Sequence, residues 1–331
     1  MRWRRIVAAI LLAAFLLLAA YGAAGAVIYD RLSKVEGECD VKWAGNTPAS
    51  FQPEQWVLDN LGPFDTRPYF VEAFEDVSFP SRTPQITISA WLLPSPVSDA
   101  PAVVVVHGLG ACKRDQSVLI PAGMLHQAGF TVLLIDMRDH GDSTYEDGRF
   151  AGGTEEYLDA LGAWDWLVEE QGIPPTRIGL VGVSLGAGTA VIAGGKEERV
   201  AAIWEDSGYA EIGSAIHDYL DSKRYPTFVG PAAPFVARVI SGDDLSGPSP
   251  IDTAKVLHGR PLFITHGTAD ETILVHQADM LAQAVRDAGG SVDPWILPGV
   301  EHAWAMLREP AEYERRLVGF FEQALARAPT N

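Results

Sequence analysis

The chain has 331 residues, of which 47% are hydrophobic and 21% are charged. This apolar content is enough for a sizeable buried core and excludes a chain that is mainly disordered. The net charge of −18 argues against a nucleic-acid binder, which would have to neutralise phosphates. Two cysteines, Cys39 and Cys112, are too few for a disulfide-stapled scaffold or a four-cysteine zinc site.

Residues 1–30 have the pattern of a signal anchor. Three arginines, Arg2, Arg4 and Arg5, precede residues 6–29, a stretch without any charged side chain. As a helix this stretch would be about 36 Å long, which is enough to cross a bilayer with some tilt. We therefore expect the basic end to stay in the cytoplasm, and the domain that follows to lie outside the cell membrane.

A cleaved signal peptide is the alternative, and it would make the protein secreted. Residues 6–20 are Leu-rich, and the small residues 24–26 offer a cleavage site, but the apolar stretch continues through Tyr29 to spanning length. The rest of the chain is more acidic than the whole, so we expect the helix to be the only contact with the lipid bilayer. An oxidising compartment would let Cys39 and Cys112 pair, but their spacing alone does not bring them together.

Short apolar strands alternate with helices after residue 85. Residues 31–85 are Pro-rich and weakly periodic, and we expect them to form a leader that packs over the main domain. The sequence predicts strands at 86–93, 102–107, 131–136, 177–183, 200–205, 261–265 and 292–297, and helices at 118–128, 155–171, 185–194, 275–288 and 310–327. This alternation predicts an α/β domain over residues 86–331, with a mostly parallel central sheet and helices on both faces.

The alternation lapses at about 208–258, a proline-containing stretch that predicts a small cap insertion over a site. The cap carries five aromatic residues that could line an apolar acyl pocket or form the cap's own core: Tyr209, Tyr219, Tyr225, Phe228 and Phe235.

Residues that can perform nucleophilic catalysis follow three of the predicted strands. The segment Gly182-Val-Ser184-Leu-Gly186 lies between an apolar strand and a helix of small residues, which is the pattern of a nucleophile elbow. A serine hydroxyl needs a base to accept its proton and an acid to orient that base. Asp270 and His302 each follow a later strand, and the carboxyl ends of strands are where α/β sheets place their sites. The sequence therefore predicts Ser184 as nucleophile, Asp270 as acid and His302 as base.

Four motifs in this order resemble the α/β-hydrolase superfamily, especially its bacterial esterases and prolyl-oligopeptidase-like serine hydrolases. They are His107-Gly-Leu-Gly110, the turn from Asp136 to Ser143, the elbow around Ser184, and His266-Gly-Thr-Ala-Asp270 with His302. The resemblance covers about residues 86–326 and leaves the leader and the cap without a counterpart. It implies an oxyanion hole made by the backbone N–H groups of Leu109 and Leu185.

Some members of the superfamily carry the acid one strand earlier, where this chain has Asp206. We expect Asp270 instead, because Asp270-Glu-Thr-Ile precedes a helix in the way the usual acid loop does. His107 and His266 end strands, and we expect both to position loops through hydrogen bonds; His140 lies in a turn and is expected to be structural as well.

The resemblance implies a membrane-anchored, extracytoplasmic serine hydrolase that cleaves a carboxylic ester through an acyl-enzyme. The same residues could serve a peptidase of the aminopeptidase kind or an acyltransferase, and a non-catalytic binding module could reuse the fold. The intact set of motifs favours catalysis. We expect a small-molecule or peptide acyl substrate, no nucleic-acid partner and no cofactor, and we expect no metal because no zinc-protease motif or calcium loop occurs.

Overall fold

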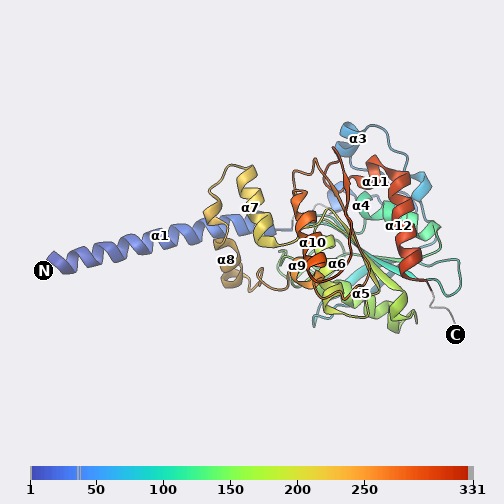
Figure 1. The fold of residues 1–331 in the computed structure, drawn as a ribbon, viewed down its shortest axis with the longest axis horizontal. Coiled ribbons are helices and arrows are strands. Elements are labelled where there is room, and N and C mark those ends of the chain that lie inside the picture. The colour runs from blue at the N-terminus through green and yellow to red at the C-terminus, as the bar shows by residue number, and fades with distance from the viewer. Residues whose placement is uncertain (1, 36, 38, 327–331) are drawn as a thin grey trace.

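A computed structural model of the chain describes residues 2–35, 37 and 39–326. Its centre is a sheet with the strand order β1-β2-β4-β3-β5-β6-β7-β8 (Figure 1). The strands are β1 Glu75–Pro80, β2 Thr87–Leu93, β3 Ala102–Val106, β4 Thr131–Ile135, β5 Ile178–Val183, β6 Ala202–Asp206, β7 Leu262–Gly267 and β8 Trp295–Leu297. Strand β2 pairs antiparallel with both β1 and β4, and the other pairings are parallel. The predicted mostly parallel sheet is confirmed.

Helices cover both faces of this sheet. They are α4 Gln116–Gln127, α5 Tyr157–Glu169, α6 Leu185–Lys196, α10 His276–Asp287, α11 Ala305–Arg308 and α12 Pro310–Ala324. Helices α5, α6 and α10 contribute to one hydrophobic core, and α4, α11 and α12 contribute to the other. In β3, Val104 and Val106 belong to the first core, and Val103 and Val105 belong to the second. Burial on both faces explains why this strand is a continuous run of apolar residues.

The leader contains the first strand of the sheet, which the sequence did not predict. Strand β1 pairs antiparallel with β2, with Glu75 opposite Leu92. Only Phe79 is fully buried in this edge strand, so the strand leaves little apolar pattern in the sequence. The rest of the leader contains α2 Cys39–Lys42, α3 Gln55–Leu61 and η1 Arg67–Tyr69. One of its contacts with the main domain joins the rings of Trp56 and Trp304, whose centres are 5.3 Å apart.

Helix α1, Arg2–Ser33, projects away from the sheet domain and is long and apolar enough to cross a membrane (Figure 1). The cap packs around the C-terminal part of α1 with α7 Ile212–Ser222, η3 Thr227–Val229 and α8 Ala232–Ile240. Ile28 and Tyr29 of α1 share a small hydrophobic core with Ile216 and Ala237 of the cap. The last cap helix, α9 Pro250–Ala254, packs on α6 instead.

The ends of some elements differ from the predicted ends. Strand β8 begins at Trp295, three residues later than predicted. Helix α12 ends at Ala324, and residue 327, where the sequence predicted its end, lies outside the described residues.

Candidate active site

Ser184 lies at a sharp turn between β5 and α6. Its backbone has φ 56° and ψ −116°, a conformation that is uncommon for a residue with a side chain. Glycine is required on both sides of this turn. A Cβ atom on Gly182 would lie 2.0 Å from the carbonyl oxygen of Gly186, and one on Gly186 would lie 2.3 Å from the carbonyl oxygen of Val106. The close approach of strand, turn and helix therefore explains the two glycines and leaves the serine at the tip.

His302 and Asp270 lie next to Ser184 although they are far away in sequence. The Nε2 atom of His302 is 2.8 Å from Oγ of Ser184, and its Nδ1 atom is 2.7 Å from Oδ2 of Asp270. The other carboxylate oxygen of Asp270 accepts hydrogen bonds from the backbone N–H groups of Thr272 at 2.9 Å and Ile273 at 2.8 Å. With Nδ1–H donating to Asp270, Nε2 is free to accept the proton of the serine hydroxyl.

Asp270 has a second histidine partner. Nε2 of His266 lies 3.1 Å from Oδ2 of Asp270 and 2.8 Å from the carbonyl oxygen of Ile273. Burial works to raise the pKa of Asp270, but the hydrogen bonds from His266 and His302 lower it to about 2. Burial likewise works to lower the pKa of His266, but the hydrogen bond to Asp270 raises it overall. Asp270 is therefore an anion at neutral pH. The sequence suggested only a loop-positioning role for His266 and did not indicate its contact with the acid.

Asp206, the alternative acid, has other partners. Its carboxylate accepts hydrogen bonds from the hydroxyl groups of Tyr313 at 2.8 Å and Ser207 at 2.9 Å. Burial raises the pKa of Asp206 to about 6. Within the described part of the chain, the hydrogen bonds of Asp206 do not include one to His302. The geometry therefore pairs His302 with Asp270.

The two predicted oxyanion donors belong to two segments near the nucleophile. Leu185 is the first residue of α6, directly after Ser184, and Leu109 belongs to the loop after β3. That loop passes close to the serine, since a Cβ atom on Gly108 would lie 3.2 Å from Cβ of Ser184. Among the described residues, the backbone N–H groups of Leu109 and Leu185 have no hydrogen-bond acceptor. Both donors are thus available to a ligand.

Two buried histidines hold the Leu109 loop in place. Nδ1 of His107 donates to the carbonyl oxygen of Gly108 at 2.8 Å, and its Nε2 accepts the backbone N–H of Met137 at 3.0 Å. Nε2 of His140 accepts the backbone N–H of Gly110 at 3.3 Å. Burial lowers the pKa of both imidazoles, so both are neutral and can accept these bonds. The expected positioning role of His107 agrees with these contacts. His140, which was expected to be structural, has a similar role through its bond to Gly110.

A disulfide ties the leader to the end of the same loop. Cys39 and Cys112, whose pairing the sequence left open, are bonded, with their Cα atoms 5.9 Å apart. Trp43 and Ala111 pack around the bond in a small hydrophobic cluster. The leader therefore restrains the segment that carries Leu109.

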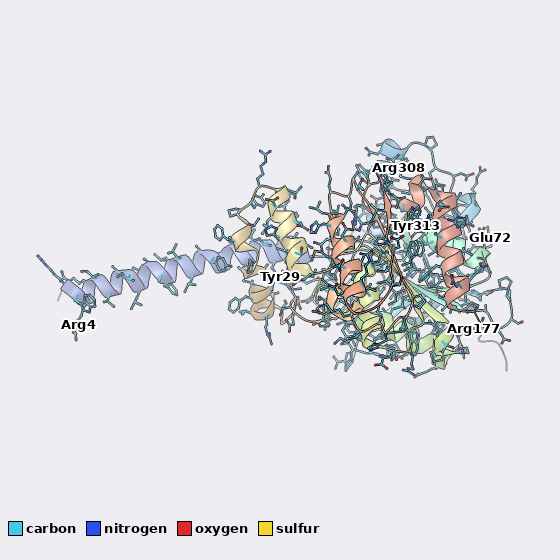
Figure 2. All side chains as sticks on the ribbon, viewed as in Figure 1. Arg4, Tyr29, Glu72, Arg177, Arg308 and Tyr313 are labelled. Carbon is cyan, nitrogen blue, oxygen red and sulfur yellow. A yellow bond between two sulfur atoms is a disulfide. The ribbon has the colours of Figure 1, made fainter. Side chains whose placement is uncertain are left out.

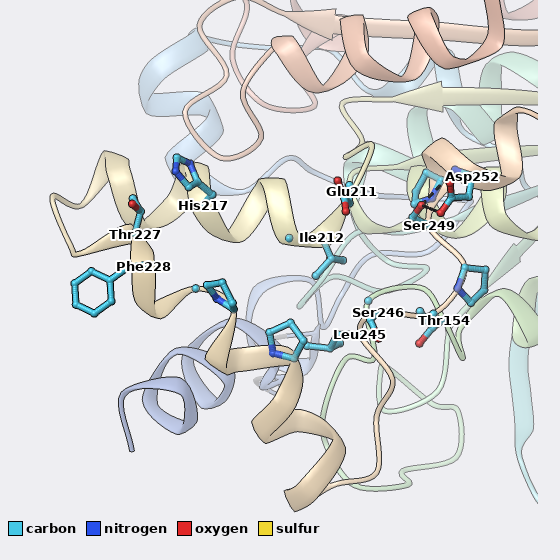
Figure 3. A pocket seen from close by; sticks show the side chains of 18 residues that line it. Thr154, Glu211, Ile212, His217, Thr227, Phe228, Leu245, Ser246, Ser249 and Asp252 are labelled. Atoms are coloured by element: carbon cyan, nitrogen blue, oxygen red, sulfur yellow. Dashed lines mark hydrogen bonds between the residues drawn. The ribbon is translucent and has the colours of Figure 1, made fainter. Parts of the chain in front are cut away.

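One cavity lies in the cap, away from the serine. It has a volume of about 570 Å³ and lies between α7, α8 and the loop that precedes α9 (Figure 3). Ile212, Pro234 and Leu245 contribute to its largely apolar lining, which includes neither Ser184 nor His302. Among the described residues, no group of three or more His, Cys, Asp or Glu side chains could hold a metal ion.

A mostly parallel sheet that carries a serine on a sharp turn after β5, with Asp270 and His302 at the ends of later strands, defines the α/β-hydrolase fold. The solved esterase Pf2001 of Pyrococcus furiosus has this architecture. It superposes with a TM-score of 0.62 over 80% of this chain and 98% of its own, at 21% sequence identity.

Residues 120–328 match the model of the prolyl oligopeptidase family, and the chain belongs to that family. An uncharacterised 31.7 kDa protein of Escherichia coli, from the traX-finO intergenic region, is 31% identical over 115 residues, which are 34% of this chain. Thiohydrolase aneE of Aspergillus aculeatus is 33% identical over 105 residues, or 31% of this chain. The chain spans only 38% and 32% of the lengths of these two relatives. Membership of the family supports a hydrolase function of the esterase or peptidase kind for this chain.

Proposed function

We propose that the protein is a membrane-anchored, extracytoplasmic serine hydrolase that cleaves a carboxylic ester. The observation that carries this proposal is the hydrogen-bonded row Ser184, His302 and Asp270, with distances of 2.8 and 2.7 Å. A row of this kind activates a serine hydroxyl that is otherwise a poor nucleophile.

The reaction proceeds in two halves. Oγ of Ser184 attacks the acyl carbonyl carbon while Nε2 of His302 takes its proton, and the oxyanion accepts hydrogen bonds from the N–H groups of Leu109 and Leu185. The intermediate collapses to an acyl-serine, and His302 gives its proton to the departing alcohol. A water molecule then attacks the acyl-serine and loses a proton to His302, which gives it to Oγ of Ser184 as the carboxylic acid leaves. Asp270 keeps the imidazole in the required tautomer throughout.

Peptide hydrolysis is the second candidate, because the chain belongs to a family named for a peptidase activity. The steps are the same, except that His302 protonates an amine as the leaving group. A p-nitrophenyl ester and a p-nitroanilide with the same acyl group separate the two activities, because only the leaving group differs.

Contacts of α1 with the cap support an anchor that is retained. The hydroxyl of Tyr21 donates to the carbonyl oxygen of Phe228 at 3.1 Å, and Gly25 packs closely against Ala232 of α8. Both contacts involve residues that cleavage after Ala26 would remove. The disulfide between Cys39 and Cys112 supports an oxidising compartment outside the cytoplasm.

Hydrolysis of the paired substrates should be measured for wild type, Ser184→Ala and Ser246→Ala in membranes. Ser246 is a cap-loop serine whose hydroxyl bonds to Asp244, so it is a control for the loss of a serine elsewhere. We expect Ser184→Ala to lose at least about 10³-fold in rate, and Ser246→Ala to retain the wild-type rate. Full activity of Ser184→Ala would refute the proposal. The mass of the membrane-bound protein, captured by a C-terminal tag, tests whether the anchor is retained.

A further inference from the structure

The cap has an exposed apolar surface, which is unfavourable in contact with water. Five large side chains on the segment before and along α8 are between 53% and 71% exposed: Tyr225, Phe228, Phe235, Val239 and Ile240. We call these five residues the cap face. The opposite side of α8 is also apolar, because Ala233, Val236 and Ala237 pack against Ile28 and Tyr29 of α1. A helix that is apolar on both sides needs an apolar environment for its outer side.

We propose that the cap face enters the outer leaflet of the bilayer beside α1, so that the protein has a second membrane contact besides its anchor. This inference rests on the anchoring proposed above. It replaces the expectation, drawn from net charge, that the helix is the only membrane contact. Charge describes attraction to anionic headgroups, whereas insertion depends on apolar area.

The depth of the cap face follows from the length of α1. If the apolar core begins just after Arg5, Tyr21 lies about 24 Å along the helix and Gly25 about 30 Å along it. The hydrocarbon core of a bilayer is about 30 Å thick. Tyr21 donates a hydrogen bond to the carbonyl oxygen of Phe228, and Gly25 contacts Ala232. Phe228 is therefore within the outer part of the hydrocarbon core, and the start of α8 is at its boundary.

The direction of α8 agrees with a shallow insertion. Its far end approaches the outer end of α1, where the hydroxyl of Tyr29 contacts Ser241. Figure 2 shows Tyr29 between the projecting helix and the sheet domain, with Arg4 near the opposite tip. Phe228 points outward from the cap, away from the other residues that line the cavity (Figure 3). Its ring is thus directed toward the lipid that surrounds α1.

The segment that carries four of the five cap-face residues has few charges, whereas Asp221, Lys223 and Arg224 precede it. Residues 227–240 contain one charged residue, Arg238, near the C-terminal end of α8, and its Nη1 atom lies 3.8 Å from Oδ2 of Asp244. A long arginine side chain at this level can reach the headgroups. Lys223 and Arg224 directly precede Tyr225, and basic and aromatic residues together are typical of the membrane interface.

Spin labels in the full chain can measure the depth of each position. The chain's only two cysteines are bonded to each other, so a single introduced cysteine is the only free thiol. Phe228→Cys and Phe235→Cys would carry a nitroxide in phosphatidylcholine vesicles. The relative access of oxygen, which prefers lipid, and a water-soluble nickel chelate then reports depth. Both side chains are exposed, so neither substitution should disturb folding, and thermal unfolding of each labelled variant checks this.

Two reference positions separate this inference from the anchoring itself. Leu17→Cys lies in α1, where the side chain is 73% exposed, and reports whether the helix spans the bilayer. Val97→Cys replaces a side chain that is 56% exposed. Val97 lies near Arg177, at the end of the molecule opposite α1 (Figure 2). We expect the ratio of oxygen to nickel access at Phe228 to be several-fold higher than at Val97 and close to the value at Leu17. Phe235 lies beyond Ala232 along α8, so its ratio should lie between the values at Phe228 and Val97.

Three results would overturn the inference. A high ratio of oxygen to nickel access at Leu17, with ratios at Phe228 and Phe235 as low as at Val97, would refute the cap contact and leave the anchor standing. A ratio at Leu17 as low as at Val97 would refute both the anchor and the cap contact. Low access of both reagents at Phe235, with dipolar broadening between labels, would show that a second copy of the chain covers the cap face instead of lipid.

Discussion

Replacing Asp270 by asparagine is a direct test of how the base is oriented. One carboxylate oxygen of Asp270 accepts the backbone N–H groups of Thr272 and Ile273, and the other accepts Nδ1–H of His302. The single carbonyl oxygen of an asparagine must satisfy the two backbone donors, so its amide NH₂ group is turned toward His302. A donor at that position favours the tautomer protonated on Nε2, which cannot accept the proton of Ser184.

The expected loss follows from this change of tautomer. We predict that kcat of Asp270→Asn falls by about 10⁴-fold, equivalent to about 5 kcal/mol in the barrier. KM should change little, because the carboxylate contacts His302 and His266 rather than the surface that would meet a substrate.

Asp206→Asn is the matched control. An asparagine there can still accept the hydrogen bond from Tyr313, so we expect its kcat to remain within about tenfold of wild type. The assay is steady-state hydrolysis of a p-nitrophenyl ester, with circular dichroism to show that both variants are folded. Loss of turnover in Asp206→Asn together with normal turnover in Asp270→Asn would refute the assignment of the acid.

Three further predictions concern the surroundings of the site. His140→Leu should lower kcat by up to about 10²-fold with little change in KM, because the loop around Gly110 loses its acceptor, and steady-state kinetics should show partial rescue in His140→Gln. Cys39→Ser should destabilise the fold by up to about 4 kcal/mol, since the bond closes a loop across 73 positions; an unchanged urea midpoint under the same conditions would contradict this. Burial raises the pKa of Glu156 to about 7, so the folded chain holds a proton that the unfolded chain has lost above about pH 5. The Tm should therefore fall between about pH 5 and pH 8, and Glu156→Gln should make this fall smaller in calorimetry.

The sequence was sufficient for the centre of the sheet and for the residues around the serine. Strands β3 and β5 are buried on both faces, so each forms a continuous apolar run that marks its position. The elbow around Ser184 is a local structure, and its two glycines are required by contacts within a few residues or with the neighbouring strand. Asp270 and His302 could be predicted to lie near it because each follows a strand end of a parallel sheet.

Features that depend on distant contacts or on weak patterns could not be predicted in this way. Strand β1 buries one residue fully, Phe79, and an edge strand with so little burial leaves no clear alternation. The bond between Cys39 and Cys112 depends on how the leader folds over the sheet. The aromatic cap residues were expected to form either a pocket or a core. Tyr209 is buried, whereas Phe228 and Phe235 are exposed, and only the packing of α8 on α1 determines which side of α8 remains open.

The claim that Ser184 is an activated nucleophile is tested most directly by labelling with a fluorophosphonate probe, followed by peptide mass mapping. The account predicts that folded wild-type protein reacts at Ser184 and that Ser184→Ala does not react at all. Folded wild-type protein that fails to react, or a Ser184→Ala variant that reacts as fast as wild type, would contradict it.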